Sequence, residues 1–445
     1  MLLSPPTLGK RSNTSSTPPS SKKTKQSPKA LQKGTGLHID SRPYNLWAKL
    51  KTDCVTYETL DRFRPFQSFV ALTDGDSRRK LEDGGLEVVP GFAAVAEKYF
   101  PAMDVKLRQG KSLRKKFPFV SPYHIGLNQT EDKPLHELLR KVQRMPSDWS
   151  PPVASNVLQQ DLNAYQCMQY VKQVVKEHDD LSFVPIQKGD FVLFDIRMAH
   201  QNSNSNKMTT PRSVFYHAYY VAHNVNKKGI ASIRERRITF DHPSDFSSKY
   251  HAEKDHMDTD RDLVKLTELG KCLFNEKEYG DMLNPGGEIE QILNKYGCLL
   301  TPRHIDYFHR FGYVVVENLV DEKDCDQLLS ELIHYSNKAG CPLGNSMTND
   351  EWQRIGGTFG AMVEFYYLPM QQRIRLNEKL YATTVNLLSH TWCNSGRNDN
   401  PWCVPYVCPF AHELDYRKLW VYIDRMNYRL PENHNQRTLV DFVKK

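Results

Sequence analysis

The sequence predicts a mainly β fold with flanking helices, an α+β sandwich or jelly roll. Three observations support this prediction. Short apolar runs of strand length recur between residues 36 and about 226, turns rich in Gly, Pro and Asp separate them, and helical spacing is largely confined to other segments. The predicted strands cover residues 66–72, 86–89, 191–195 and 214–221.

An insertion near residues 98–182 interrupts these strands, and apolar residues within 158–176 recur there with helical spacing. Another helix is expected at about 262–274, before a linker at 285–300. The ends of the chain are expected to be tails, at 1–35 and 433–445. The first of them has the Ser, Pro and Lys composition of a disordered segment.

A new unit is expected at residues 301–432. Thr301-Pro302 has the residue types that begin a helix, and Gly312 marks its end. The unit continues with a strand at 313–316, a helix from Asp321 to about 334, a helix at 371–388 and an alternating strand at 419–426.

Bulk composition excludes several classes of protein. No apolar run approaches the ~20 residues of a membrane-spanning helix, and the Pro-rich start is unlike a secretion signal. Nine scattered cysteines, an odd number, favour a reducing compartment over a disulfide framework. The net charge is +8, but seven of these charges lie in residues 1–36. The body of the chain is therefore near neutral, and nucleic acid is not an indicated partner for it.

The basic tail predicts a location. Lys10-Arg11 and the cluster Lys22-Lys23-Thr24-Lys25 have the spacing of a bipartite nuclear-import signal. An ordinary solvated basic tail is the alternative. We therefore expect a nuclear or cytoplasmic protein, with the nucleus favoured, a nuclear-import receptor as one partner and no membrane partner.

One motif carries the predicted chemistry, His38-Ile39-Asp40. Side chains at positions i and i+2 of a strand point to the same side, so His38 and Asp40 can reach one metal ion. His200, which ends the segment that follows the strand at 191–195, is the expected third ligand. Two imidazoles and one carboxylate suit catalytic iron(II). Arg212 stands just before the next strand, where its planar guanidinium can bind the carboxylate of a co-substrate.

Each of these residues has a simpler interpretation. H-x-D is common by chance, and His304-Ile305-Asp306 is a second example on a predicted helix, where positions i and i+2 do not share a face. We interpret that copy as helix surface. In the simpler interpretation, His200 is an exposed loop histidine and Arg212 is a structural arginine. A zinc site is a further alternative, which would use Cys393, Cys403, Cys408 and His412. These residues lack the C-x2-C spacing that is usual in zinc sites, so we interpret them as cysteines and a histidine that do not bind one ion.

The chain resembles the phytanoyl-CoA dioxygenase family in elements that occur in the family's order. They are His38-x-Asp40, residues 71–74 with 84–91, residues 189–195 followed by His200, and Arg212. It departs from the family at Phe92, where Ser-His is frequent, and in the length of its insertion.

The resemblance implies a double-stranded β-helix (jelly-roll, cupin-like) core. It implies iron(II) on His38, Asp40 and His200, with 2-oxoglutarate on Arg212, O₂ as second substrate and ascorbate as an optional reductant. Because the carboxylate of Asp40 is present, the implied reaction is hydroxylation, not halogenation, with release of succinate and CO₂.

The order of the parts differs from that of the family. The helix–strand–helix pattern with which members open appears here at residues 300–326, after the iron motifs. Residues 301–432 thus resemble the family's N-terminal half and residues 36–284 its catalytic half. The chain is either circularly permuted or a piece of a tandem or misassembled protein, and one copy of each half favours permutation. Permutation predicts that residues 419–426 pair near 37–41 or 66–72, with Tyr422 or Arg425 lining the co-substrate pocket.

The expected function is an Fe(II)- and 2-oxoglutarate-dependent dioxygenase that hydroxylates a small organic substrate, whose identity the sequence does not reveal. The alternative from another class is a catalytically silent jelly-roll scaffold in the nucleus, against which the intact ligand set argues. A nuclear enzyme acting on nucleic acid or on a protein side chain is a further alternative, which the near-neutral body does not favour.

Overall fold

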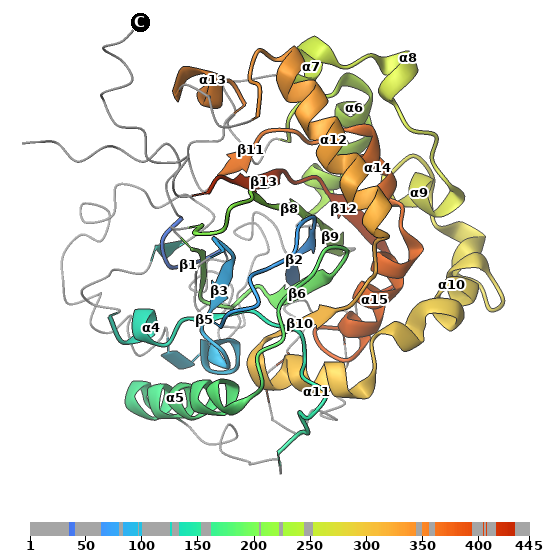
Figure 1. Ribbon diagram of the computed structural model, residues 1–445. Coiled ribbons are helices and arrows are strands. Elements are labelled where there is room, and N and C mark those ends of the chain that lie inside the picture. The colour runs from blue at the N-terminus through green and yellow to red at the C-terminus, as the bar shows by residue number, and fades with distance from the viewer. Residues whose placement is uncertain are drawn as a thin grey trace, which may run out of the picture.

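A computed structural model describes part of the chain in detail, and all structural statements below concern that part. The described residues are 35–40, 64–79, 83–96, 98–99, 125–126, 133–152, 162–203, 206–221, 226–243, 252–343, 349–355, 361–393, 404, 406 and 415–431. Outside them lie the predicted tails apart from Thr35, residues 100–124, 127–132 and 153–161 of the insertion, and Cys403, Cys408 and His412. The architecture is mixed α+β, with antiparallel sheets and helices around them (Figure 1).

The smaller of the two main sheets holds five strands in the order β4-β1-β7-β3-β5. Each strand is only two or three residues long, and all four pairings between neighbouring strands are antiparallel. The strands are β1 His38–Ile39, β3 Leu86–Val88, β4 Ile125–Gly126, β5 Arg140–Lys141 and β7 His200–Asn202.

The larger sheet holds six strands in the order β10-β6-β2-β8-β13-β11, and a separate pair joins β12 to β9. Its three central strands, β6, β2 and β8, are flanked by strands from the C-terminal part of the chain: β10 pairs with β6 and β13 pairs with β8. The strands are β2 Phe66–Ala71, β6 Phe191–Asp195, β8 Arg212–Tyr216, β9 Ala218–Val221, β10 Tyr313–Val316, β11 Met362–Val363, β12 Leu419–Tyr422 and β13 Met426–Arg429.

A tight backbone contact at Gly189 joins the N-terminal residues 36–226 to the C-terminal residues 301–431. Its N–H donates to the carbonyl of Ala71, and its own carbonyl accepts from the N–H of Val320. Gly189 has a φ of +88°, and a Cβ there would collide with the carbonyl oxygen of Val320. Only glycine satisfies both conditions without strain.

Two predictions about strands were wrong in their partners or their length. Residues 419–426 do not pair near 37–41 or 66–72: β12 pairs with β9, and β13 pairs with β8 in the sheet that does not carry His38. The strand expected at 214–221 is divided at His217 into β8 and β9, and residues 423–425 likewise separate β12 from β13.

The helix predicted from Thr301-Pro302 is α11 Pro302–Phe311. Thr301 accepts a hydrogen bond from the N–H of His304, and Gly312 ends the helix at a φ of +82°. The helix predicted from Asp321 is α12 Glu322–Lys338. Where one helix was predicted at 371–388, the structure has two, α14 Pro369–Arg375 and α15 Glu378–Ser389. The helix breaks between them because the Asn377 side chain caps the second helix.

The remaining helices refine the other expectations. In the insertion, α5 Ala164–Asp180 begins at a capping box formed by Asn163 and Gln166, later than expected. The helix expected at 262–274 is two short ones, and the expected linker contains a helix with buried Ile289 and Ile292. These helices are α8 Thr259–Asp262, α9 Glu268–Leu273 and α10 Glu288–Tyr296, with α4 Lys133–Glu137, α6 Lys227–Thr239, α7 Ala252–His256 and α13 Asn349–Arg354 elsewhere.

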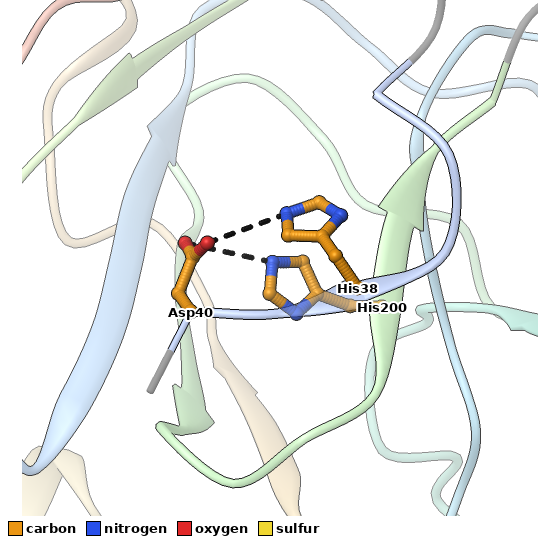
Figure 2. A group of neighbouring side chains, drawn as sticks. All are labelled: His38, Asp40 and His200. Atoms are coloured by element: carbon orange, nitrogen blue, oxygen red, sulfur yellow. Dashed lines mark ion pairs between the residues drawn. The ribbon is translucent and has the colours of Figure 1, made fainter. Parts of the chain in front are cut away.

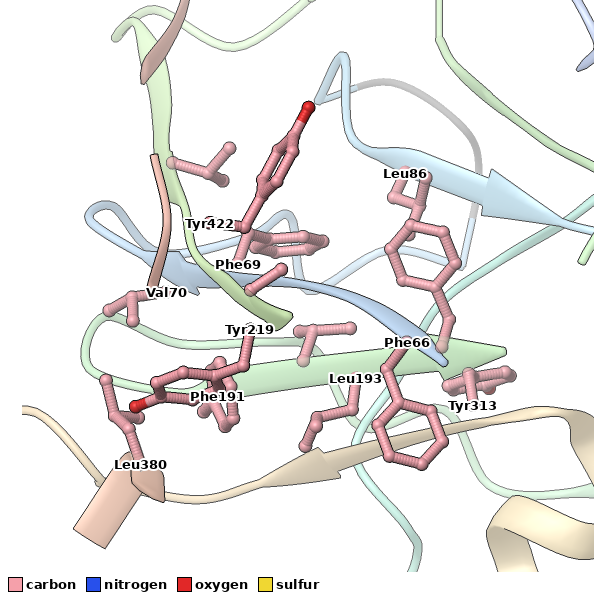
Figure 3. Packing of buried hydrophobic residues seen from close by; sticks show 14 of the residues in the cluster. Phe66, Phe69, Val70, Leu86, Phe191, Leu193, Tyr219, Tyr313, Leu380 and Tyr422 are labelled. Carbon is pink, nitrogen blue, oxygen red and sulfur yellow. The ribbon is translucent and has the colours of Figure 1, made fainter. Parts of the chain in front are cut away.

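The larger sheet is buried on both faces. Phe69 and Leu86 lie on one side of it, while Phe191, Tyr219 and Leu380 of α15 lie on the other (Figure 3). These side chains belong to one continuous cluster, which includes residues from 36–226 and from 301–431. Among the described helices, none combines the length and the apolar character needed to cross a membrane.

Candidate metal centre

Three side chains converge on one point between strands of the smaller sheet. His38 and His200 are directly opposed in the pairing of β1 with β7, and Asp40 follows β1 (Figure 2). The Nε2 atom of His38 lies 3.4 Å from Oδ1 of Asp40, and Nε2 of His200 lies 3.9 Å from Oδ2. One ligand atom from each residue can be chosen so that all lie within 4.8 Å of one another.

Backbone hydrogen bonds fix the protonation of both imidazoles. Nδ1 of His38 lies 2.7 Å from the carbonyl oxygen of Gly36, and Nδ1 of His200 lies 2.9 Å from that of Met198. A carbonyl oxygen can only accept, so each Nδ1 carries a proton. In the neutral ring, Nε2 then presents a lone pair, and in both residues this atom faces Asp40.

The lone pairs and the negative charge that face each other in this arrangement favour a bound cation. Burial, followed by the neighbouring His38, lowers the pKa of His200 to about 4, so its ring is neutral at neutral pH. A lone pair of His200 therefore faces a carboxylate, and two acceptors at this separation repel each other. A metal ion between them removes the repulsion, and Nδ1–H bonds to carbonyls are the usual way in which ligating histidines are oriented. The three residues fit a metal ion, although this donor set also suits metals other than iron.

The second H-x-D behaves as predicted. His304 and Asp306 lie on α11, where the Nδ1 atom of His304 accepts from the N–H of Thr301 at 3.1 Å as part of the helix cap. The same three-residue pattern therefore forms a candidate metal site on a strand and a cap on a helix. Of the four residues of the zinc alternative, only Cys393 is described, and its side chain is half-buried.

Two residues beside the site were not found from the sequence, Arg64 and Asp424. The guanidinium of Arg64 lies over the ring of Tyr422, 4.0 Å from its centroid, and 4.0 Å from Oδ2 of Asp424. Burial acts to lower the pKa of Arg64, but Tyr422, Asp424 and Asp40 together raise it. Arg64 thus links the C-terminal segment electrostatically to the metal ligand Asp40. No local pattern marks either residue, because the contact depends on strands distant in sequence.

Arg212 is the first residue of β8, and its side chain is buried. Its strand is linked to the metal ligands: Tyr216, on the same side of β8, accepts a hydrogen bond from Nδ2 of Asn202, two residues beyond His200. Arg212 lies 5.7 Å from the ring centroid of Phe69 and lines a small hollow with Asp83 and Lys141. Within the described residues it makes no ion pair, and its one hydrogen bond is a long contact of 3.4 Å to the carbonyl of Gly84.

Tyr422 and Arg425, which we expected to line the co-substrate pocket, make different contacts. Tyr422 packs against Arg64 and stands edge-on to Tyr220, with ring centroids 5.1 Å apart. Arg425 lies 3.7 Å from a carboxylate oxygen of Glu364 and 3.8 Å from one of Asp424, so its charge is already balanced by acids.

No family model matches the chain, and no curated protein matches it either. The resemblance to a family is drawn from the sequence motifs alone and stays a prediction.

Proposed function

We propose that this chain is an iron(II)- and 2-oxoglutarate-dependent dioxygenase that hydroxylates an organic substrate, related to the phytanoyl-CoA dioxygenase family. The observation that carries the proposal is the arrangement of His38, Asp40 and His200, whose ligand atoms meet while both Nδ1 atoms are held by backbone carbonyls. Two imidazoles and one carboxylate leave coordination positions for a co-substrate and O₂, which suits non-haem iron.

When bound, iron(II) with 2-oxoglutarate and O₂ would supply the oxidising chemistry, with succinate and CO₂ as products. The chain contributes position and environment. His38, Asp40 and His200 would hold the metal, and Arg212 would bind the far carboxylate of 2-oxoglutarate through its unused N–H donors. Phe194, whose ring centroid lies 5.0 Å from that of His200, packs edge-on against this ligand.

A metal-dependent assay tests the proposal. The full chain, loaded anaerobically with iron(II) and then supplied with O₂ and 2-oxoglutarate, should form succinate slowly even without a substrate. Asp40→Ala should abolish succinate formation, and Asp306→Ala, in the second H-x-D, should not change it. Iron binding without succinate formation would support a metal site but would contradict the proposed reaction.

We also propose that the core is a jelly roll whose two halves occur in exchanged order. The pairing of β10 with β6 and of β13 with β8 supports the proposal, because strands of residues 301–431 lie in the same sheet as strands of residues 36–226. A chain rearranged so that residues 301–432 precede residues 36–284 should fold and bind metal as the original does. An insoluble rearranged chain would favour a piece of a tandem or misassembled protein.

A further inference from the structure

Arg429, the last residue of β13, is a buried cation to which no described residue supplies a counter-charge. Its side chain is 0% exposed, and Nε, Nη1 and Nη2 all lack a hydrogen-bond partner among the described residues. Burial, together with the like charge of Arg212, lowers its pKa to about 10, so it stays charged at neutral pH. An isolated buried charge is strongly unfavourable, and such groups are normally paired or bind a ligand.

The like charge beside it is positioned by the sheet. Arg429 and Arg212 are directly opposite each other in the antiparallel pairing of β13 with β8. Directly opposed residues project from the same face, with Cβ atoms ~5 Å apart. Two cations in that position repel each other, so the pair does not stabilise the ligand-free sheet.

The turn between Asp83 and β3 packs against both side chains and makes room for that of Arg429. A Cβ on Gly84 would lie 2.7 Å from Cγ of Arg429, and one on Gly85 would lie 3.5 Å from Nε of Arg212. Gly84 also has a φ of +71°. A side chain at Gly84 would fill space that Arg429 uses, so this glycine serves the placement of Arg429. A side chain at Gly85 would instead meet Oδ1 of Asp83, at 2.7 Å.

The nearest acid is already engaged. Asp83 lies 2.7 Å from Nζ of Lys141 and accepts hydrogen bonds from the N–H groups of Asp76 and Gly85. Burial opposes the effect, but Arg212 and Lys141 lower the pKa of Asp83, which keeps it ionised. Asp83 thus faces two cations, Arg212 and Lys141. Arg429, beside Arg212, adds a third positive charge, so the site carries an excess of positive charge.

We infer that Arg429 is a second anion-binding guanidinium, and that Arg212 and Arg429 together clamp one carboxylate of an incoming dicarboxylic acid. This inference rests on the proposed function for the identity of the acid, 2-oxoglutarate. Two guanidinium groups provide up to ten N–H donors, and a carboxylate accepts in two directions, so both arginines can bind it at once. The bound anion also cancels the repulsion between them.

The clamp divides the two parts of the site between segments of the chain. The metal ligands all come from residues 38–200, whereas the anion site is completed only by a residue of β13. Metal binding and anion binding are therefore separable by substitution at Arg429.

The test measures binding of 2-oxoglutarate and of glutarate, which lacks the keto group, to the full chain with and without Mn(II). We expect Arg429→Gln and Arg212→Gln each to weaken both acids at least ~10-fold, the loss expected for a hydrogen bond to a charged group. Mn(II) affinity should stay unchanged. Arg234→Gln, at an exposed position of α6, is the control and should bind both acids normally. Because a repulsive pair is removed, ligand-free Arg429→Gln should melt no lower than the original chain.

The outcomes separate this inference from the function on which it rests. If Arg429→Gln binds 2-oxoglutarate as tightly as the original chain while Arg212→Gln does not, the clamp is rejected and the dioxygenase remains. If Arg429→Gln loses Mn(II) as well, Arg429 supports the fold and the clamp is again rejected. If the original chain binds sulfate or phosphate instead of 2-oxoglutarate, and Arg429→Gln loses that binding, the paired-arginine site stands and the co-substrate is wrong. Binding of none of these anions overturns the site.

Discussion

His38 and His200 are cross-strand partners, and in each the Nδ1 atom lies against the carbonyl oxygen of the residue two positions earlier. The two imidazoles are therefore oriented in the same way by the backbone just before their own strands, without a bound metal. Since backbone carbonyls hold the rings, substitution of a side chain elsewhere should not release them. Only the third ligand, Asp40, depends on the chain beyond the end of β1.

Asp40→Ala should lower affinity for iron(II) or Mn(II) by at least ~100-fold, because it removes a direct ligand and the negative charge between the imidazoles. The fold should persist, since Asp40 lies at the end of a short strand. Titration calorimetry of the metal-free chain measures the effect. Asp306→Ala is the matched control in the helical H-x-D, and a similar loss there would contradict the assignment of the site.

Arg212→Lys should weaken 2-oxoglutarate by ~10-fold although the charge is retained. A lysine ammonium binds as a point charge and cannot offer two parallel N–H donors to a carboxylate. The concentration of 2-oxoglutarate that half-saturates succinate formation reports the change, while metal affinity should be unaffected. Arg261→Lys, with an exposed side chain, is the control. Unchanged saturation in Arg212→Lys would mean that the guanidinium shape is not used.

His217→Phe should make the protein less sensitive to acid. Burial, with a smaller effect of Arg375, lowers the pKa of His217 to about 3, whereas a histidine in the unfolded chain titrates near 6.5. Between these values the unfolded chain binds more protons, so stability falls as the pH drops below about 6.5 and is unaffected above it.

The phenylalanine variant should avoid about 2 kcal/mol of the loss in unfolding free energy between about pH 7 and pH 5. Urea denaturation at the two pH values measures this. His334→Phe, at an exposed position of α12, should retain the full acid sensitivity. Parallel pH dependence in the original chain and in His217→Phe would show that His217 is not buried in its neutral form.

Gly189→Ala should destabilise the fold by more than ~2 kcal/mol, since the new Cβ meets the carbonyl of Val320 and the backbone has a positive φ. Gly286→Ala isolates the second effect, because Gly286 also has a positive φ, of +76°, but has open space around it. It should cost about 1 kcal/mol. Equal unfolding free energies for the two variants would contradict the close contact between Gly189 and Val320.

The parts of the fold that the sequence predicted are those set by short-range rules. The convergence of His38 and Asp40 follows from the two-residue period of a strand, and α11 follows from Thr301-Pro302 and Gly312. Apolar periodicity alone did not predict the break between α14 and α15, because a single capping side chain, Asn377, overrides an otherwise continuous pattern.

The parts that were missed depend on which strand lies beside which. The pattern of residues 419–426 correctly indicated extended chain, but nothing in it specifies β9 and β8 as partners. Arg429 was missed for the same reason. Near the end of the chain it reads as an ordinary charged residue, and only its pairing opposite Arg212 places it at the candidate anion site.

The pairing of β8 with β13 has a consequence for how the protein is made. When ribosomal synthesis reaches the end of β8 at Tyr216, roughly 200 residues remain before β13 emerges. At ~5–20 residues per second, the nascent chain then waits roughly 10–40 s with one edge of β8 unpaired. β6 waits in the same way for β10. Exposed strand edges pair readily with other chains, so the nascent protein is most prone to aggregate, and most in need of chaperones, before its last strands are translated.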